Sequence, residues 1–258
     1  MSLLALLSPA KKQTQCGNLA SLSPTQPRCK QQTAQLVEQL KTFTMKDLEQ
    51  NLSISASLAA LNHTRYQDFT PERYHLDNAS PCLFAFQGDA YKALAAHTLT
   101  QDEVTYLQEH LRILSGLYGL LRPMDLIQAY RLEMGIPLKN DAGNTLYDFW
   151  QQQITKMLNQ ECQQNGMTHI INLASQEYTK AIIQAELSVP FVTIAFKQPH
   201  KGQYKTIGIL AKKARGQMTR FIATKKPTTL TQLKKFNTDG YQYNAELSDK
   251  KTLVFLQQ

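Results

Sequence analysis

The sequence has few of the residues that build disulfide frameworks and metal sites. It has 4 cysteines among 258 residues, and no two of them form a C-x-x-C pair. This spacing is typical of reduced thiols and argues against a zinc ribbon or a small disulfide scaffold. The 6 histidines show no metal-ligand spacing. We therefore expect no metal site and no cofactor.

Long hydrophobic runs are also missing. No stretch approaches the roughly 20 apolar residues that a membrane span requires. The apolar residues 3–7 have no basic residue before them and form too short a run for a signal peptide, so they predict a buried first strand. We expect a cytoplasmic protein without a membrane partner. The sequence also has no P-loop and no G-x-G-x-x-G, so it carries neither of these phosphate-binding motifs.

Positive charge is present in excess, and it is concentrated in one region. Residues 196–258 hold 13 of the 28 lysines and arginines but only three acidic residues. Clustered like charge repels itself and adds nothing to fold stability. Such a cluster favours an anionic partner, and phosphate is the commonest one. We therefore predict a partner that carries phosphate and is bound through it without sequence specificity, and we predict no stable protein partner.

Helical and extended segments alternate along the chain. A capping-box pattern at Thr100–Glu103 predicts a helix that runs to about Leu114, and Thr145 predicts the start of another helix through Leu158. Without a convincing linker, this pattern predicts a single α/β mixed domain over residues 1–258, a mixed β-sheet with helices packed around it. Further helices are predicted at 34–43 and 45–69, a surface loop at 13–33, and strands at 3–7, 82–86, 168–174, 191–196, 203–210 and 251–257.

The segment 211–222 predicts a basic helix. Its apolar residues fall on one arc and its basic residues on the opposite arc, with Gly216 among them, where the missing side chain permits close approach of a backbone or a phosphate. The functional interpretation is a helix that contacts phosphates, and the alternative is a solvated face that only keeps the helix soluble. The basic residues are Lys212, Lys213, Arg215 and Arg220.

The segment 111–123 predicts a helix-hairpin-helix-like element. Two glycines, Gly116 and Gly119, would let backbone N–H groups reach a phosphate, with Arg112 and Arg122 on either side. The usual hairpin has one residue between its glycines, whereas this one has two. The alternative is a tight helix–helix connection with both arginines in surface ion pairs. On the first interpretation, this element and the basic helix form one cationic groove.

Polar side chains follow three of the predicted strands. Ligands bind beyond the carboxyl ends of parallel strands, so these groups would surround one crevice if the strands are neighbours. The alternative for each is an ordinary helix cap or turn. Arg131 and Glu133, two residues apart, could form a structural ion pair or one wall of the same pocket. A lysine with acids and hydroxyls suits proton transfer or nucleophilic chemistry. The candidate catalytic residues are Ser8, Lys11, Asp89, Tyr91, Arg131, Glu133, Ser175, Glu177 and Tyr178.

These segments together resemble one family over nearly the whole chain. The blocks that carry the resemblance include Ser8-Pro9-Ala10-Lys11, Phe86-x-Gly88-Asp89-x-Tyr91, Tyr130-Arg131-Leu132-Glu133-Met134-Gly135, Ile171-Asn172-Leu173-Ala174-Ser175-x-Glu177-Tyr178 and Ala211-Lys212-Lys213-Ala214-Arg215-Gly216. The sequence is similar to the bacterial YaaA-type peroxide-stress-resistance proteins. The sequence departs from the family pattern in two places: Ala129 stands where proline is usual, and Lys12-Gln13 where Thr-Leu is usual.

The resemblance implies an unusual mixed α/β fold and duplex-DNA binding through a positive cleft with a helix-hairpin-helix-like element. It also implies a role in limiting iron-dependent oxidative damage, but it names no reaction. An alternative function is an enzyme that acts on a small or nucleotide-like substrate in a strand-end pocket with Lys11, Glu133, Ser175 and Glu177. Direct iron storage has the least support, because His and Cys do not cluster.

Overall fold

The computed structural model describes residues 2–16 and 23–258, and these form one α/β domain around a large sheet. Six residues of the predicted loop at 13–33, residues 17–22, lie outside the described residues. The strands of the described part are β1 (Ser2–Leu7), β2 (Lys12–Gln13), β3 (Ser80–Pro81), β4 (Phe86–Gln87), β5 (Leu111–Ser115), β6 (Gly119–Leu121), β7 (Leu126–Ile127), β8 (Met167–Asn172), β9 (Phe191–His200), β10 (Gln203–Lys205), β11 (Tyr241–Asn244) and β12 (Thr252–Gln257).

The large sheet has a parallel centre and antiparallel edges. Its order is β11-β12-β9-β8-β1-β5-β6, with β10 paired to β9. Strands β12, β9, β8, β1 and β5 run parallel, whereas β6, β10 and β11 each pair antiparallel with a neighbour. Strand β1 lies between β8 and β5, and its residues 3–7 are buried. That position explains the unbroken apolar run at the start of the chain, because a central parallel strand is covered on both faces.

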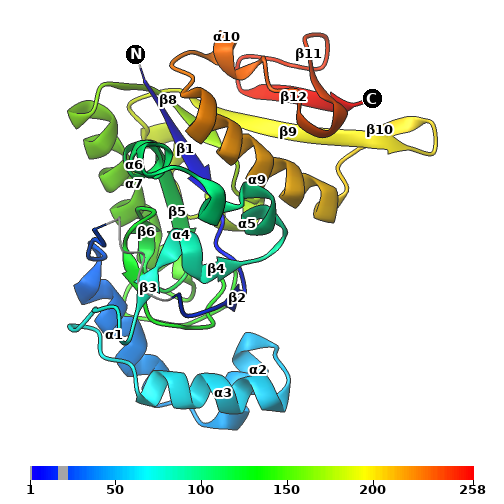
Figure 1. Ribbon diagram of the computed structural model, residues 1–258. Helices are drawn as coiled ribbons and strands as arrows, with labels where there is room; N and C mark the ends of the chain where they lie inside the picture. Colours follow the sequence, from blue (N-terminus) through cyan, green and yellow to red (C-terminus); the bar gives the residue numbers. More distant parts are fainter. Residues whose placement is uncertain (1, 17–22) are drawn as a thin grey trace.

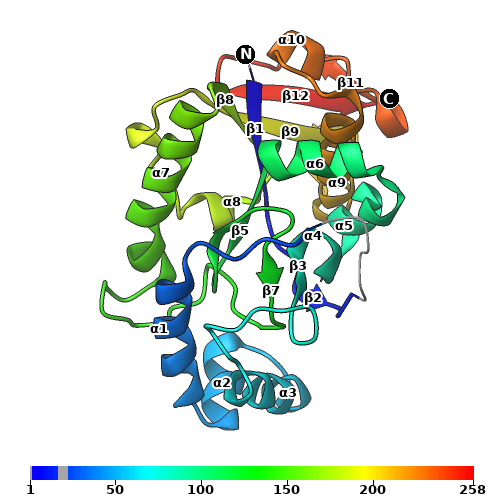
Figure 2. The same cartoon turned by 60° about the vertical axis from the view of Figure 1, so that its left-hand side comes forward.

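Helices cover both faces of this sheet. Helix α7 lies on one side, and α5, α6 and α9 lie on the other (Figure 2). Helices α1, α2 and α3 extend from one end of the molecule (Figure 1). The helices of the described part are α1 (Lys30–Lys41), α2 (Met45–Leu52), α3 (Ala56–Gln67), α4 (Cys82–Ala85), α5 (Asp89–Leu94), α6 (Gln101–His110), α7 (Leu146–Gln164), α8 (Gln176–Thr179), α9 (Gly208–Lys225) and α10 (Leu230–Leu233).

The predicted helix starts are confirmed at both capping boxes. In α6 the Thr100 hydroxyl accepts from Glu103 N–H at 3.2 Å while the Glu103 carboxylate accepts from Thr100 N–H at 2.8 Å. Thr145 and Asp148 make the same reciprocal pair at the start of α7. The strands predicted at 3–7, 168–174, 191–196 and 251–257 are also confirmed.

Three of the predicted segments are wrong in type or extent. The predicted strand 82–86 is mostly the short helix α4, because an apolar run of this length fits a buried helical turn as well as a strand. The predicted helix 45–69 divides at Ser53, which adopts a left-handed conformation between α2 and α3. The predicted strand 203–210 ends at Lys205, and α9 begins three residues later.

The predicted helix-hairpin-helix-like element is a β-hairpin. Helix α6 ends at His110, and the next residues form β5 and β6, joined by a tight turn. Leu111 and Arg112 pair with Ala5 and Leu6 of β1, so tertiary pairing overrides the local helical pattern. The hairpin is fully buried, with Leu117 and Tyr118 at 0% exposure.

Candidate functional site

The candidate site lies beyond the carboxyl ends of β1 and β8. These strands are parallel neighbours, with Leu6 opposite Asn172, so the loops that follow them meet. The Ser175 N–H donates to the Ser8 hydroxyl oxygen at 2.8 Å, and the Ser8 hydroxyl donates to Ser175 Oγ at 3.3 Å. The predicted convergence of these two strand ends is therefore confirmed by their direct contact.

The third polar segment reaches the same place by a route that the sequence pattern did not predict. It does not follow a parallel strand. Instead, β4 pairs antiparallel with β2, the short strand just after the β1 loop, with Lys12 opposite Gln87. This pairing brings Asp89 and Tyr91 of α5 beside that loop, and the Tyr91 hydroxyl donates to the Ser8 carbonyl oxygen at 2.9 Å.

A cavity of about 320 Å³ opens among these segments. This volume lies within the range of small-molecule pockets in proteins. Helix α9 contributes two basic side chains to the wall, Lys212 and Arg215. Every predicted catalytic candidate lines this cavity: Ser8, Lys11, Asp89, Tyr91, Arg131, Glu133, Ser175, Glu177 and Tyr178.

Glu133 is the centre of charge in the cavity. Its Oε1 accepts a hydrogen bond from Arg131 Nε at 2.8 Å and lies 3.1 Å from Lys11 Nζ. The two predicted interpretations of Arg131 and Glu133 therefore both hold, since they form an ion pair and also line the pocket. The other carboxylate oxygen, Glu133 Oε2, is buried and has no hydrogen-bond partner among the described residues. A buried carboxylate oxygen without a donor is costly, so this atom is available to a donor on a ligand.

The remaining polar groups of the site are held by the backbone. Glu177 Oε1 accepts from Gly135 N–H at 3.2 Å, and the Tyr147 hydroxyl donates to the Glu177 carbonyl oxygen at 2.9 Å. Burial raises the pKa values of Tyr91 and Tyr178. Both tyrosines therefore stay neutral, so they can donate or accept hydrogen bonds but cannot serve as phenolate bases at neutral pH.

The basic residues of helix α9 that were predicted to contact phosphate lie in different environments. Lys212 and Lys213 are exposed, and Lys213 pairs with Asp239 at 2.7 Å. Arg220 lies away from the cavity, where its Nη1 donates to the carbonyl oxygens of Leu94 and Ala95 at the end of α5. Arg215 is half-buried, and its Nε is buried without a hydrogen-bond partner among the described residues.

Gly216 does permit a close approach, and the approaching group is protein backbone. A Cβ atom at this position would lie 1.9 Å from the carbonyl oxygen of Ala90. Helix α9 therefore packs directly on α5, and Gly216 is not free to contact a phosphate. The same contact sets Arg215, the preceding residue, beside the cavity.

The glycines predicted to contact phosphate at 116 and 119 are also occupied within the fold. A Cβ on Gly116 would lie 2.4 Å from the Leu132 carbonyl oxygen, and one on Gly119 would lie 2.5 Å from the Trp150 ring. The carbonyl of Gly116 accepts from Trp150 Nε1 at 2.8 Å. The two glycines let the β5–β6 turn pack against the Leu132 backbone and against Trp150 of α7. Neither glycine lines the cavity.

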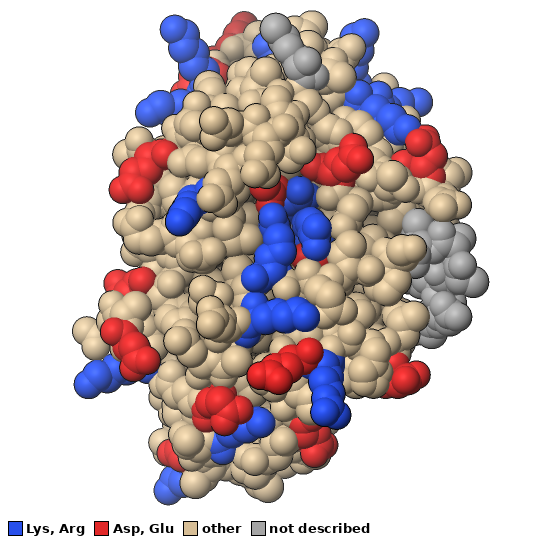
Figure 3. Space-filling view, turned by 90° about the vertical axis from the view of Figure 1, so that its left-hand side faces the viewer, with Lys and Arg blue, Asp and Glu red and all other residues tan. Residues whose placement is uncertain are grey.

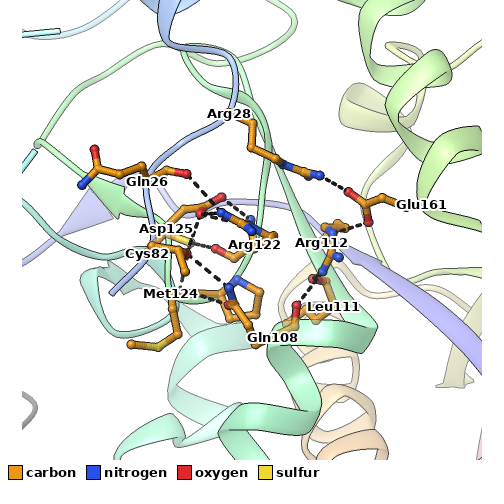
Figure 4. A network of polar contacts seen from close by, with 12 residues as sticks. Gln26, Arg28, Cys82, Gln108, Leu111, Arg112, Arg122, Met124, Asp125 and Glu161 are labelled. Carbon is orange, nitrogen blue, oxygen red and sulfur yellow. Dashed lines mark hydrogen bonds and ion pairs between the residues drawn. The ribbon is translucent and has the colours of Figure 1, made fainter. Parts of the chain in front are cut away.

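Arg112 and Arg122 belong to a separate polar network (Figure 4). Arg112 is 4% exposed and donates from Nε to Glu161 at 2.5 Å, and Glu161 also pairs with Arg28. Arg122 pairs with the buried Asp125. The expected single groove that would include these arginines is wrong, because neither lines the cavity.

Figure 3 shows the side of the molecule that carries α6 and α7, where Lys and Arg side chains run down the middle of the surface with acidic side chains beside and between them. Because acidic side chains lie among the basic ones, this face is not uniformly cationic.

Two further properties of the described residues bear on function. No group of three or more His, Cys, Asp and Glu side chains is arranged to hold a metal ion in the part of the chain that the structure describes. Across residues 2–16 and 23–258, no helix is both long and apolar enough to cross a lipid bilayer.

Two residues of the site, Lys12 and Gln13, were not among the predicted site residues. Lys12 lines the cavity although its position departs from the family pattern, and Gln13, which also lines it, accepts from Tyr130 N–H at 2.8 Å. The basic character of Lys12 and its place directly after Lys11 were the available signals. The pairing of β2 with β4, which brings both residues to the cavity, has no such signal.

The fold and the cavity define an α/β protein with a cationic, mixed-charge pocket at the ends of parallel strands. A family of peroxide stress proteins, described as peroxide stress protein YaaA, matches residues 3–247. A UPF0246 protein of Francisella tularensis subsp. novicida (strain U112) is 44% identical over 253 residues, which cover 98% of this chain and 99% of the relative. A UPF0246 protein of Legionella pneumophila (strain Paris) is 42% identical over 254 residues, with 98% and 100% covered.

The chain therefore belongs to the YaaA family of peroxide stress proteins. The family description supports a role in oxidative stress.

Proposed function

We propose that this protein protects the cytoplasm during peroxide stress by binding duplex DNA through a positively charged surface, and that this binding limits iron-dependent oxidative damage. The observation that carries the proposal is the position of α9. Its Lys212 and Arg215 line the same cavity as Lys11 and Lys12, and Lys213 is exposed beside them. Side chains of this kind hold phosphates without reading base sequence.

Salt dependence tests the duplex-binding proposal. Each phosphate contact releases counterions, so the logarithm of the binding constant should fall with the logarithm of salt concentration by about 0.9 per contact on B-form DNA. The double variant Lys212→Gln/Lys213→Gln should weaken binding and reduce this slope by about 2. Fluorescence anisotropy with a labelled duplex measures both quantities.

The control variant for this titration is Lys46→Gln. Lys46 is an exposed lysine of α2 and does not line the cavity, so its loss removes a positive charge at a distance from α9. Its slope should equal that of the unchanged protein. A duplex affinity that is indifferent to salt, or equal slopes for all three proteins, contradicts the proposal.

A second candidate function is an enzyme that acts on a small or nucleotide-like substrate in the cavity. The specific observation in its favour is that carboxylates, hydroxyls and a lysine meet in one cavity, with Glu133 Oε2 lacking a protein partner. The variant Glu177→Ala should abolish peroxide protection in a complementation assay while duplex affinity is unchanged. If duplex affinity falls together with protection, the two activities do not have separate sites.

A further inference from the structure

Two buried polar atoms at the cavity, one on a carboxylate and one on a guanidinium, have no hydrogen-bond partner among the described residues. Glu133 is 9% exposed, and its Oε2 is a hydrogen-bond acceptor without a donor. Arg215 makes no ion pair with any residue that the structure describes, and its buried Nε is a donor without an acceptor. Both residues line the same cavity. A ligand that completes the site therefore carries an anionic group for the arginine and an N–H or O–H donor for the carboxylate.

The net charge of the wall favours an anion. The basic side chains Lys11, Lys12, Arg131, Lys212 and Arg215 line the cavity with three acids, Asp89, Glu133 and Glu177. Arg131 and Lys11 both contact Glu133. Arg215 and Lys212 on α9 form no ion pair with a described residue, so their charge faces the cavity without local compensation. Arginine is the side chain best suited to a phosphate in such a position because its guanidinium offers a planar fork of donors.

Part of the wall is apolar and aromatic. Leu7, Leu132 and Leu173 line the cavity together with Tyr91 and Tyr130. The hydroxyls of both tyrosines are already hydrogen-bonded within the protein, that of Tyr91 to the Ser8 carbonyl and that of Tyr130 to Ser115. Such a wall suits a flat ring system.

We propose that the cavity binds a single nucleotide unit, with its phosphate on Arg215 and an N–H or O–H of its base or sugar on Glu133 Oε2. A nucleotide combines the phosphate, the ring and the donor that these three parts of the wall require. The proposal rests on the second candidate function above and specifies its ligand. The unit is either a free nucleotide or an unpaired nucleotide in a DNA strand, since both carry the same chemistry.

Gly216 is the positioning residue of this site. Because α9 packs on the Ala90 carbonyl at Gly216, the backbone that carries Arg215 is held at the cavity wall before any ligand arrives. Pre-ordering of this kind lowers the entropy lost on binding.

The direct test is a binding titration of the full chain by isothermal calorimetry. The probes are the four deoxynucleoside monophosphates, a five-nucleotide single strand, and inorganic phosphate. We expect saturable binding of at least one nucleotide probe with a stoichiometry of one, tighter than phosphate. Binding by the monophosphates identifies a free nucleotide as the source of the unit, and binding by the single strand alone identifies a nucleic acid; both outcomes support the proposal.

Three variants locate the binding. Arg215→Gln should weaken nucleotide binding at least tenfold, and Arg215→Lys should weaken it less because the charge is kept. Glu133→Gln should change the preference among the four monophosphates, since it alters the acceptor that faces the base or sugar. The control Lys225→Gln removes one positive charge from the exposed end of the same helix and should bind like the unchanged protein.

Several outcomes overturn the proposal. These are no binding of any nucleotide probe, phosphate binding as tight as nucleotide binding, or Arg215→Gln and Arg215→Lys variants that fold, as judged by thermal unfolding, and bind like the unchanged protein. The duplex titration with the Lys212→Gln/Lys213→Gln variant remains a separate measurement. Loss of nucleotide binding with a normal duplex salt slope rejects the nucleotide site alone, and the opposite result rejects duplex binding alone.

Discussion

At the scale of single residues, Arg112 and Arg215 carry the same charge but have opposite environments. Arg112 was a candidate phosphate contact, yet it is 4% exposed and its guanidinium is bonded to Glu161 and to the carbonyl oxygens of Gln108 and Leu111. Burial lowers the pKa of Arg112, with Glu161 acting in the opposite direction. Arg215 is half-buried and has no acidic partner among the described residues. The sequence pattern does not distinguish the two arginines, whereas in the structure only Arg215 is available to a ligand.

The role of Arg112 leads to a stability prediction. The variant Glu161→Gln leaves Arg112 and Arg28 without their shared carboxylate, and a buried charge that loses its partner destabilises a protein by about 3–5 kcal/mol. We expect a loss of this size in the free energy of unfolding, measured with urea. The control is Glu186→Gln, which removes an exposed carboxylate that forms no ion pair with the described residues. A loss below about 1 kcal/mol for Glu161→Gln would contradict the structural role.

At the scale of elements, the contact between α5 and α9 determines the shape of the site. Both helices lie on the same side of the sheet, and α5 carries Asp89 and Tyr91 while α9 carries Lys212 and Arg215. Their close approach depends on the absence of a side chain at position 216. Glycine is unfavourable inside a helix, but Gly216 allows α5 and α9 to approach closely and to line the same cavity.

This contact predicts opposite effects for two glycine substitutions in one helix. Gly216→Ala places a Cβ 1.9 Å from the Ala90 carbonyl oxygen, so α9 must shift, and overpacking of this kind costs about 1–3 kcal/mol. Gly208→Ala, in the first turn of α9, meets no atom within 4 Å and should be neutral or stabilise by up to about 1 kcal/mol. Urea unfolding of both variants measures the difference, and nucleotide affinity should fall only for Gly216→Ala. Equal stabilities would show that α9 does not depend on this contact.

At the scale of the whole molecule, the net charge of +8 is unevenly distributed. Its excess lies in the last quarter of the sequence, which contributes β10, α9, α10, β11 and β12 to the fold. Like charges in one region repel each other, and salt screens this repulsion.

We therefore expect Tm to rise when sodium chloride is increased from about 0.01 M to about 0.15 M, because the Debye length shortens from about 30 Å to about 8 Å. The variant Lys250→Glu/Lys251→Glu reverses two exposed charges in the turn between β11 and β12 and should show a smaller rise. Differential scanning fluorimetry gives both curves. A Tm that falls with salt, or an equal rise in both proteins, would mean that the clustered charge carries no cost to stability.

Much of the fold and of the site could be predicted from local patterns. Capping residues marked the starts of α6 and α7, and buried apolar runs marked β1, β8, β9 and β12. Polar groups after strands marked the cavity, since the carboxyl ends of neighbouring parallel strands meet at one edge. These signals work because periodicity, caps and strand ends depend on residues close together in the chain.

The remaining features depend on partners far away in the chain. Residues 111–115 became a strand because β1 offered an unpaired edge, and Arg112 became structural because Glu161 lies opposite it on α7. Asp89 and Tyr91 reached the cavity through the pairing of β2 with β4. The sequence by itself determined most of the elements, the clustered charge and the polar groups at the ends of β1 and β8. Only the tertiary structure decided which arginines are neutralised and which face the cavity, because burial and ion pairing join residues that no local pattern connects.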